Sequence, residues 1–313
     1  MKILAFVFAI ILVVLLGFFI WTSLQISLIE KKFPPVGNIV KLAGAKFHYV
    51  DVLDKTNKIA PVIFVHGASG NLKDQQEAFI DALKGKARLL FIDRPGYGYS
   101  ERADADTPAK QATQFKLLLD NLKIEKVVLV GHSLGSASVA AFAVLYPDRV
   151  KGLVFLSPAT HPWPGGVRWY YKLASMPLLG TLFTETLALP IGQLSLEGGI
   201  KSVFDPQEPV KNYTTRTAIP LILRPASFRY NAHDVATLNQ FVTKFSPRYK
   251  EIKAPTVIIT GDKDDIVLPS IHSIGLERDI EGAELIVLPN MGHKPDFMAT
   301  DKVVEVILKL GKN

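Results

Sequence analysis

The 313-residue sequence contains no cysteine. This absence excludes disulfide bonds, thiol nucleophiles and cysteine-ligated zinc or iron–sulfur sites. Glycine-rich loops of the Walker or dinucleotide-binding type are also missing, and the histidines show no spacing typical of a metal site. We therefore expect a protein that needs no metal ion and no bound cofactor.

The sequence also lacks a dense basic tract, although its net charge is +7. Nucleic-acid-binding proteins concentrate positive charge on one face or along one helix, whereas Lys and Arg are spread along this chain. We expect no nucleic-acid partner. Hydrophobic residues make up 48% of the chain, which at this length favours an enzyme-sized folded domain.

The sequence does contain a long hydrophobic run: residues 3–21 are apolar and include no charged residue. As a helix this run is roughly 28 Å long, close to the hydrocarbon thickness of a bilayer. A cleavable signal peptide is the competing interpretation, but its apolar region is usually shorter and ends in small residues, whereas this run ends at Trp21. We predict a single-pass transmembrane anchor within residues 1–29, and hence a membrane location.

The charges that flank the run give little information on its orientation. Lys2 and the amino terminus stand on one side, and Lys31 and Lys32 stand on the other. The numbers of positive charges on the two sides of the run are therefore nearly equal, and the positive-inside rule does not fix its orientation. The default of an amino terminus inside the cell places the following domain on the extracytoplasmic side.

The rest of the chain has the pattern of an α/β fold. Residues 38–42 and 45–53 alternate apolar and polar side chains, which predicts a hairpin at a sheet edge. Short, continuous apolar runs follow, separated by amphipathic stretches; they lie at residues 61–65, 88–92, 126–130, 151–156, 255–260 and 284–288. This alternation predicts a mostly parallel sheet covered by helices on both faces.

The alternation fails once, after the sixth predicted strand. Residues 159–246 are rich in proline, leucine and aromatic residues and contain no comparable strand. We interpret this segment as a mostly helical cap over the sheet, inserted into a core made of residues 30–158 and 247–313.

A nucleophile motif follows the apolar run at 126–130. The sequence Gly131-His132-Ser133-Leu134-Gly135 joins this predicted strand to a predicted helix, the context that a G-x-S-x-G nucleophile elbow requires. Such a turn lifts the Ser133 hydroxyl clear of the sheet and aims the Leu134 N–H at a developing oxyanion. The second oxyanion donor should be the Ala68 N–H, in the loop His66-Gly67-Ala68-Ser69 after the 61–65 strand. His66 itself we interpret as a residue that braces this loop.

The base and acid of a catalytic triad are expected downstream, because serine-first triads of this architecture place histidine last. His293 follows the last predicted strand and is our candidate base. The carboxylate that orients it must come from the end of the preceding strand, where Asp262, Asp264 and Asp265 are present.

These motifs resemble the α/β-hydrolase superfamily, and more narrowly its cap-bearing branch of esterases, carbon–carbon bond hydrolases, perhydrolases and epoxide hydrolases. The segment from Asp93 to Ser100 is similar to the D-x-x-G-x-G-x-S loop of these proteins. Their G-x-x-D-x-[IV]-[VP] loop carries the triad acid at its fourth position, which corresponds to Asp264 here. The resemblance covers residues 36–313 and implies the α/β-hydrolase fold with a helical cap after the sixth strand.

The resemblance leaves several substrates open. Dehalogenases and epoxide hydrolases use aspartate at the elbow, where this chain has Ser133. Carbon–carbon bond hydrolases are disfavoured because the tryptophan expected soon after the acid is replaced by Ile266-Val267.

We therefore expect a serine hydrolase that cleaves a small-molecule or lipid-like ester, with a hydrophobic acyl group, through an acyl-enzyme. An acyltransferase or perhydrolase, a carbon–carbon bond hydrolase and a non-catalytic binding protein remain alternatives. Trp163, Trp169 and Ile266 are the candidate pocket residues.

Overall fold

The computed structural model describes residues 1–54 and 59–312. One mixed sheet has the strand order β1-β2-β4-β3-β5-β6-β7-β8, and its first two pairings, β1 with β2 and β2 with β4, are antiparallel whereas the others are parallel. The strands are β1 (Asn38–Leu42), β2 (Ala45–Val52), β3 (Val62–Val65), β4 (Leu89–Ile92), β5 (Val127–His132), β6 (Val150–Leu156), β7 (Thr256–Gly261) and β8 (Glu284–Leu288). The predicted fold class is confirmed.

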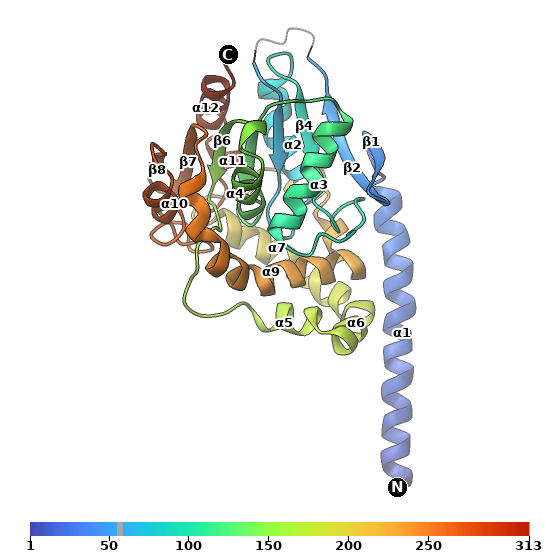
Figure 1. The fold of residues 1–313 in the computed structure, drawn as a ribbon. Coiled ribbons are helices and arrows are strands. Elements are labelled where there is room, and N and C mark those ends of the chain that lie inside the picture. The colour runs from blue at the N-terminus through green and yellow to red at the C-terminus, as the bar shows by residue number, and fades with distance from the viewer. Residues whose placement is uncertain (55–58, 313) are drawn as a thin grey trace.

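Helices cover both faces of the sheet (Figure 1). Side chains alternate along each central strand, so that Ile63 and Val65 of β3 face one helical layer while Val62 and Phe64 face the other. The first layer consists of α3 (Pro108–Asn121), α4 (Gly135–Leu145) and α10 (Ser273–Asp279); the second contains α2 (Leu72–Leu83) and α12 (Thr300–Gly311), with the short α11 (Pro295–Met298) before α12.

The edge strand β8 differs from the prediction of a strand buried on both faces. Its residues are half-buried or exposed, since it has a single neighbour, β7. The central strands β3, β4 and β5 are completely buried, as their continuous apolar runs predict.

A helical segment lies between β6 and β7, where the cap is expected (Figure 1). It contains α5 (Trp169–Ser175), α6 (Pro177–Thr186), α7 (Ala188–Phe204), α8 (Tyr213–Arg216) and α9 (Pro225–Phe245), with 3-10 turns at Ile219–Leu223 and Ser246–Glu251; a third 3-10 turn, Pro147–Arg149, precedes β6. The exact limits of the cap, residues 159 and 246, remain a prediction.

The N-terminal helix α1 (Lys2–Lys32) projects from the body and is long and apolar enough to cross a membrane (Figure 1). It runs further than the predicted anchor, because residues 30–32, predicted as part of the core, continue the helix. The helix ends before Pro34-Pro35, which cannot continue it.

Phe64 provides a test of the core. Its ring is buried in the middle of β3 and stacks on Phe79 and Phe91, with centroids 5.1 and 4.7 Å away. Phe64→Ala leaves a cavity that the sheet cannot close, so we expect the free energy of unfolding to fall by about 3–5 kcal/mol. Denaturant titration of the detergent-solubilised full chain measures this. Leu53→Ala at an exposed position is the control and should change it by about 0.5 kcal/mol or less; equal effects would contradict the packing described.

Candidate active site

Ser133 stands on the tight turn between β5 and α4. Its backbone lies in the left-handed region, with φ of +51°, which a residue with a side chain rarely adopts. The Ser133 N–H donates to the Leu156 carbonyl at 2.9 Å, and the Ser133 carbonyl accepts from the Ala159 N–H at 3.1 Å. The adjoining strand β6 and the chain after it therefore hold the strained turn in place.

The two glycines of the motif allow this turn to pack. A Cβ atom on Gly131 would lie 2.9 Å from the Ser136 Cα, and one on Gly135 would collide with the backbone carbonyl of His66. Both positions therefore require glycine for close approach of neighbouring backbone. The sequence motif thus reflects packing around Ser133 as well as the nucleophile itself.

Two backbone N–H groups are available beside Ser133. Leu134 and Ala68 belong to one apolar cluster, and a Cβ atom on Gly67 would lie 3.0 Å from the Ser133 Cβ, so the loop after β3 approaches the elbow closely. Within residues 1–54 and 59–312, neither the Ala68 nor the Leu134 N–H donates to a protein acceptor. Such free donors at the start of a helix and in a facing loop suit an oxyanion.

His293 and Asp264 form a buried pair at adjacent strand ends. The His293 Nδ1 lies 2.7 Å from the Asp264 Oδ2, and the Asp264 Oδ1 accepts the Ile266 and Val267 N–H groups at 3.0 and 2.9 Å. Burial alone raises the pKa of Asp264, but His293 and these hydrogen bonds outweigh burial and lower it, so the carboxyl group is ionised. An ionised carboxylate can only accept, so the His293 Nδ1–H donates to Asp264, and Nε2 is the ring nitrogen outside this pair.

The loop that carries His293 is fastened to the elbow. The His132 Nε2–H donates to the His293 carbonyl at 3.0 Å, and the centroids of the two rings are 5.0 Å apart. His132 is buried, which lowers its pKa to about 4, so it is neutral at pH 7. The residue next to Ser133 thus holds the backbone of His293.

The predicted pocket residues lie in different places. Ile266 and His293 line a cavity of about 430 Å³ together with Asp265 and four residues of the cap: Gly198, Lys201, Ser202 and Asp205. Trp163 packs in the cluster that contains Leu134 and Ala68. Trp169 does not join them, because 67% of its surface is exposed and its ring packs against Tyr170 and Phe183 on the outside of the cap.

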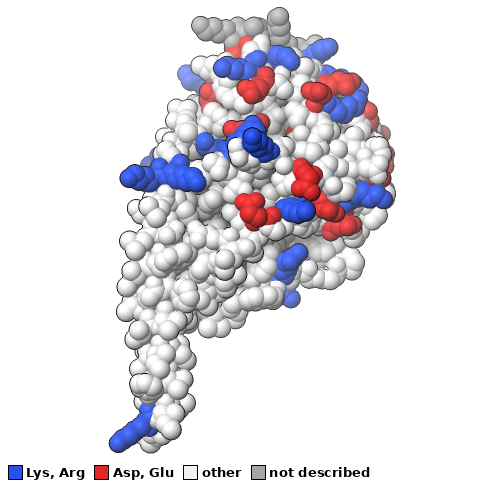
Figure 2. Space-filling model, turned by 180° about the vertical axis from the view of Figure 1, so that it is seen from behind, with Lys and Arg blue, Asp and Glu red and all other residues white. Residues whose placement is uncertain are grey.

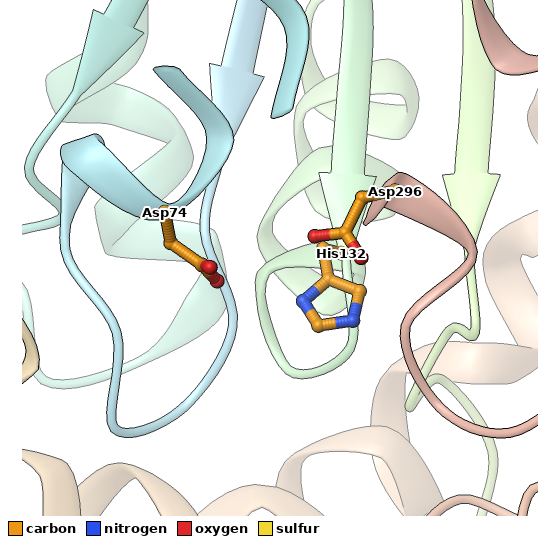
Figure 3. Close-up of side chains that lie close together, drawn as sticks. All are labelled: Asp74, His132 and Asp296. Atoms are coloured by element: carbon orange, nitrogen blue, oxygen red, sulfur yellow. The ribbon is translucent and has the colours of Figure 1, made fainter. Parts of the chain in front are cut away.

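A cluster of buried charges lies behind the elbow, and its role is not evident from the sequence. Asp74, His132 and Asp296 come from α2, the end of β5 and α11, and their side chains converge on one space (Figure 3). Their ligand-type atoms all lie within 4.8 Å of one another, an arrangement that could hold a metal ion.

The ammonium group of Lys294 already provides a cation at this cluster. Its Nζ lies 3.0 Å from an oxygen of Asp74 and 3.0 Å from an oxygen of Asp296, and the Tyr213 hydroxyl donates to Asp74 at 2.7 Å. Burial lowers the pKa of Lys294, but the two carboxylates outweigh burial and raise it well above its usual value. We therefore interpret the cluster as an internal ion network rather than a metal site.

The cap is tied to the oxyanion loop by a second polar network. Asn231 of α9 accepts the Ser69 N–H at 2.8 Å and donates to the Ser69 hydroxyl at 3.1 Å. The fully buried Arg94 donates to Asp234 of α9 at 3.0 Å and to the Gly67 carbonyl at 3.2 Å. The sequence contains no signal for this network, since Asn231 lies 162 positions from Ser69 and Asp234 lies 140 positions from Arg94.

His66 braces the same loop from below. The His66 Nδ1 lies 2.8 Å from the Gly67 carbonyl, and its Nε2 accepts the Arg94 N–H at 3.1 Å. Burial lowers the pKa of His66 to about 3, so the ring is neutral with its proton on Nδ1. One ring nitrogen is thus bonded to the loop and the other to the Arg94 backbone after β4.

Comparison with known proteins agrees with this geometry. Residues 60–182 match the family model for the α/β hydrolase fold. A 2-hydroxy-6-oxo-6-phenylhexa-2,4-dienoate hydrolase from Burkholderia cepacia is 30% identical over 221 residues, which cover 66% of this chain and 70% of the relative. A 2-hydroxy-6-oxononadienedioate/2-hydroxy-6-oxononatrienedioate hydrolase from Comamonas testosteroni is 28% identical over 250 residues, with 74% and 80% covered.

Solved structures show the same architecture at lower identity. A meta-cleavage product hydrolase from Pseudomonas fluorescens IP01 superposes with a TM-score of 0.70 at 20% identity, over 88% of this chain and 97% of the other. The epoxide hydrolase CorEH gives a TM-score of 0.71 at 18% identity, over 88% and 98%. Because equally similar structures have different activities, this likeness establishes the fold alone.

Asp264→Asn tests the assignment of the acid. An amide in place of the carboxylate favours the wrong histidine tautomer, so we expect Ser133 to react about 10³–10⁴-fold more slowly with a fluorophosphonate, by analogy with serine proteases. Gel-based labelling of the full chain over time gives the rate. Asp262→Asn, at an exposed carboxylate of the same loop that does not line the cavity, should stay within about twofold. A stronger effect of Asp262→Asn would transfer the role to that residue.

Lys294→Met tests the ion network. It removes the cation while leaving Asp74 and Asp296 buried, and breaking a buried ion pair in this way costs about 3–5 kcal/mol of folding free energy. Denaturant unfolding measures the loss. Lys302→Met on the exposed face of α12 is the matched control, with an expected change of about 0.5 kcal/mol or less. Unchanged stability of Lys294→Met would show that the network contributes nothing to folding.

Proposed function

Because the chain belongs to the α/β-hydrolase family, we propose that it is a serine hydrolase that cleaves a carbon–carbon bond beside a ketone. The observation that carries this proposal is the name shared by its relatives, which are hydrolases of 2-hydroxy-6-oxo-dienoates. These substrates contain a ketone and a carboxylate but no ester or amide, so water can divide them only at a carbon–carbon bond.

The expectation of an ester-cleaving enzyme is therefore wrong. It rested on the elbow, on the triad and on Ile266-Val267 standing in place of a tryptophan, whereas the most similar relatives named here act on dienoates. The error has a physical origin. A serine activated by histidine attacks a carbonyl carbon in either case, and only the leaving atom, oxygen or carbon, differs. The tryptophan position concerns one side chain after the acid and does not determine which bond breaks.

We assign each step of this reaction to residues of the buried site. We assign Ser133 as the nucleophile, His293 as the base and Asp264 as the acid that orients it. The His293 Nε2 takes the Ser133 proton as Oγ adds to the ketone carbon, and the carbonyl electron pair moves onto oxygen. The Leu134 and Ala68 N–H groups then stabilise this oxyanion.

The second half of the reaction breaks the carbon–carbon bond. As the oxyanion collapses, the bonding pair leaves on the neighbouring carbon, where it is delocalised through the conjugated chain to a carbonyl at position 2. That carbonyl requires the 2-hydroxy group to be in its keto form. The His293 proton neutralises the leaving fragment, and a water molecule, deprotonated by His293, releases the acyl group from Ser133 as a carboxylic acid.

We propose in addition that α1 is retained as a membrane anchor. Support comes from its contacts with the body: Thr22 donates to the Thr186 carbonyl of α6 at 3.2 Å, Ile29 and Phe33 are buried in an apolar cluster of the cap, and Glu30 pairs with Arg224 at 2.9 Å. Cleavage within this region would expose these partners to water. A signal peptide, by contrast, needs no such contacts with the mature domain.

The substrate class can be tested directly. We expect the detergent-solubilised full chain to hydrolyse 2-hydroxy-6-oxo-6-phenylhexa-2,4-dienoate to benzoic acid and a 2-hydroxydienoate, with a kcat/KM far above that for p-nitrophenyl esters. Loss of dienoate absorbance and product chromatography measure this. Ser133→Ala should lower kcat by about 10³-fold or more. Efficient cleavage of esters with no turnover of any dienoate would refute the proposal, and full activity in Ser133→Ala would refute the nucleophile.

A further inference from the structure

An apolar surface lies on the outside of the cap, beside α1. Leu178 and Leu194 are 85% and 90% exposed, which is unusual for large apolar side chains on a folded domain. We call this surface the apolar cap face, and it is formed by Trp169, Leu178, Leu179, Leu182, Ile191 and Leu194 of α5, α6 and α7.

The apolar cap face is almost free of charge. Residues 173–196 contain a single ionisable residue, Glu185. Figure 2 shows the same contrast on the side that it draws, where the surface next to the projecting helix is nearly all white and charged side chains gather on the part of the body farther from the free end of that helix. A soluble domain that faced only water would gain nothing from this arrangement.

The packing of α1 fixes where this face stands relative to the apolar span. Residues 3–14 of α1 are exposed, whereas Leu15, Phe18 and Trp21 are half-buried. The body therefore runs alongside the last part of the apolar span, over the seven residues from Leu15 to Trp21, a rise of about 10 Å. In Figure 1, α5 and α6 are the parts of the body that lie nearest to the free end of α1.

The position of the apolar cap face beside α1 indicates what covers it. If α1 spans a bilayer with residues 3–21 in the hydrocarbon, α5 and α6 must reach the depth of the outermost part of the same leaflet. Interfacial helices bury their apolar face about 5–10 Å below the headgroups, which matches the 10 Å overlap. We propose that the apolar cap face is embedded in the lipid bilayer that α1 crosses.

The cavity of the active site opens along the same helix. Leu194 of the apolar cap face, Gly198 and Lys201 are spaced i, i+4 and i+7 on α7, so they share one side of that helix. Gly198 and Lys201 line the cavity that His293 also lines. The lining of the cavity thus begins at Gly198, one turn of helix from Leu194. An amphiphilic substrate dissolved in the membrane then has a short path from the lipid contact to the cavity.

This inference rests on the proposed anchor but not on which bond the enzyme cleaves. It also does not require a second protein chain. A partner protein or a second copy of the chain could cover the same face, and the experiment below separates these occupants from lipid.

The absence of native cysteine makes a direct test possible. Leu178→Cys and Leu194→Cys in the full chain are labelled with an environment-sensitive fluorophore and reconstituted in vesicles of phosphatidylcholine and phosphatidylglycerol. Phe6→Cys reports on the span, and Glu281→Cys, on the sheet side with an 87% exposed side chain, reports on water. Nitroxide-bearing lipids and aqueous iodide are the two quenchers.

We expect nitroxide lipids to quench Leu178→Cys and Leu194→Cys as they quench Phe6→Cys, and iodide to quench only Glu281→Cys. Quenching of the two cap positions by iodide, with Phe6→Cys still quenched by lipid, overturns the inference while leaving the anchor in place. Protection of both cap positions from both quenchers, together with crosslinking between copies, also overturns it in favour of a protein interface.

A second variant separates the lipid contact from the reactivity of the active site. Leu178→Glu/Leu194→Glu places two charges on the apolar cap face and leaves Ser133, His293 and Asp264 untouched. We expect its fluorophosphonate labelling rate to equal that of the wild type, while quenching of a label at Leu182→Cys by nitroxide lipids is lost. An unchanged lipid signal would contradict the inference. Because labelling and lipid contact are read separately, failure of the proposed chemistry and failure of the membrane contact are distinguished.

Discussion

The buried ammonium group of Lys294 holds together the segments that must meet at the active site. It pairs with Asp74 of α2 and Asp296 of α11, and Tyr213 of the cap donates to the same Asp74 carboxylate. Lys294 directly follows His293, so these ion pairs fix the backbone next to that side chain. A buried cation is stabilising only while both carboxylates remain with it, which makes α2, the cap and the base loop dependent on one another.

The sequence predicted those parts of the site that short, contiguous motifs specify. Gly131, Ser133 and Gly135 must occupy one tight turn, and the end of β7 must supply the carboxylate, so short motifs specified these positions. Lys294 and Asn231 could not be found in this way, because their partners are brought together only by the packing of segments more than 100 residues apart. Trp169 was expected at the pocket but lies on the outside of the cap. An apolar residue in a cap can face either a pocket or the outside, and the composition of the segment is the same in both cases.

The substrate was the least predictable property. The elbow, the free N–H groups and the His293–Asp264 pair provide for attack on a carbonyl carbon, and this geometry is the same for an ester and for a ketone. The preference for a ketone is therefore a proposal that rests on the names of the relatives. The cap contributes to this site in several ways: α9 holds the oxyanion loop through Asn231, and α7 lines the cavity through Lys201.

The continuity of α1 with the body has a mechanical consequence. There is no flexible tether between the apolar span and the catalytic domain, since the helix continues to Lys32 and Thr22, Ile29 and Phe33 are buried against the body. In a chain whose α1 crosses a bilayer, the domain cannot swing or tumble relative to the membrane normal. The cavity is then held at one height and one orientation relative to the bilayer, and for a substrate dissolved in lipid the search becomes diffusion in a plane rather than in a volume.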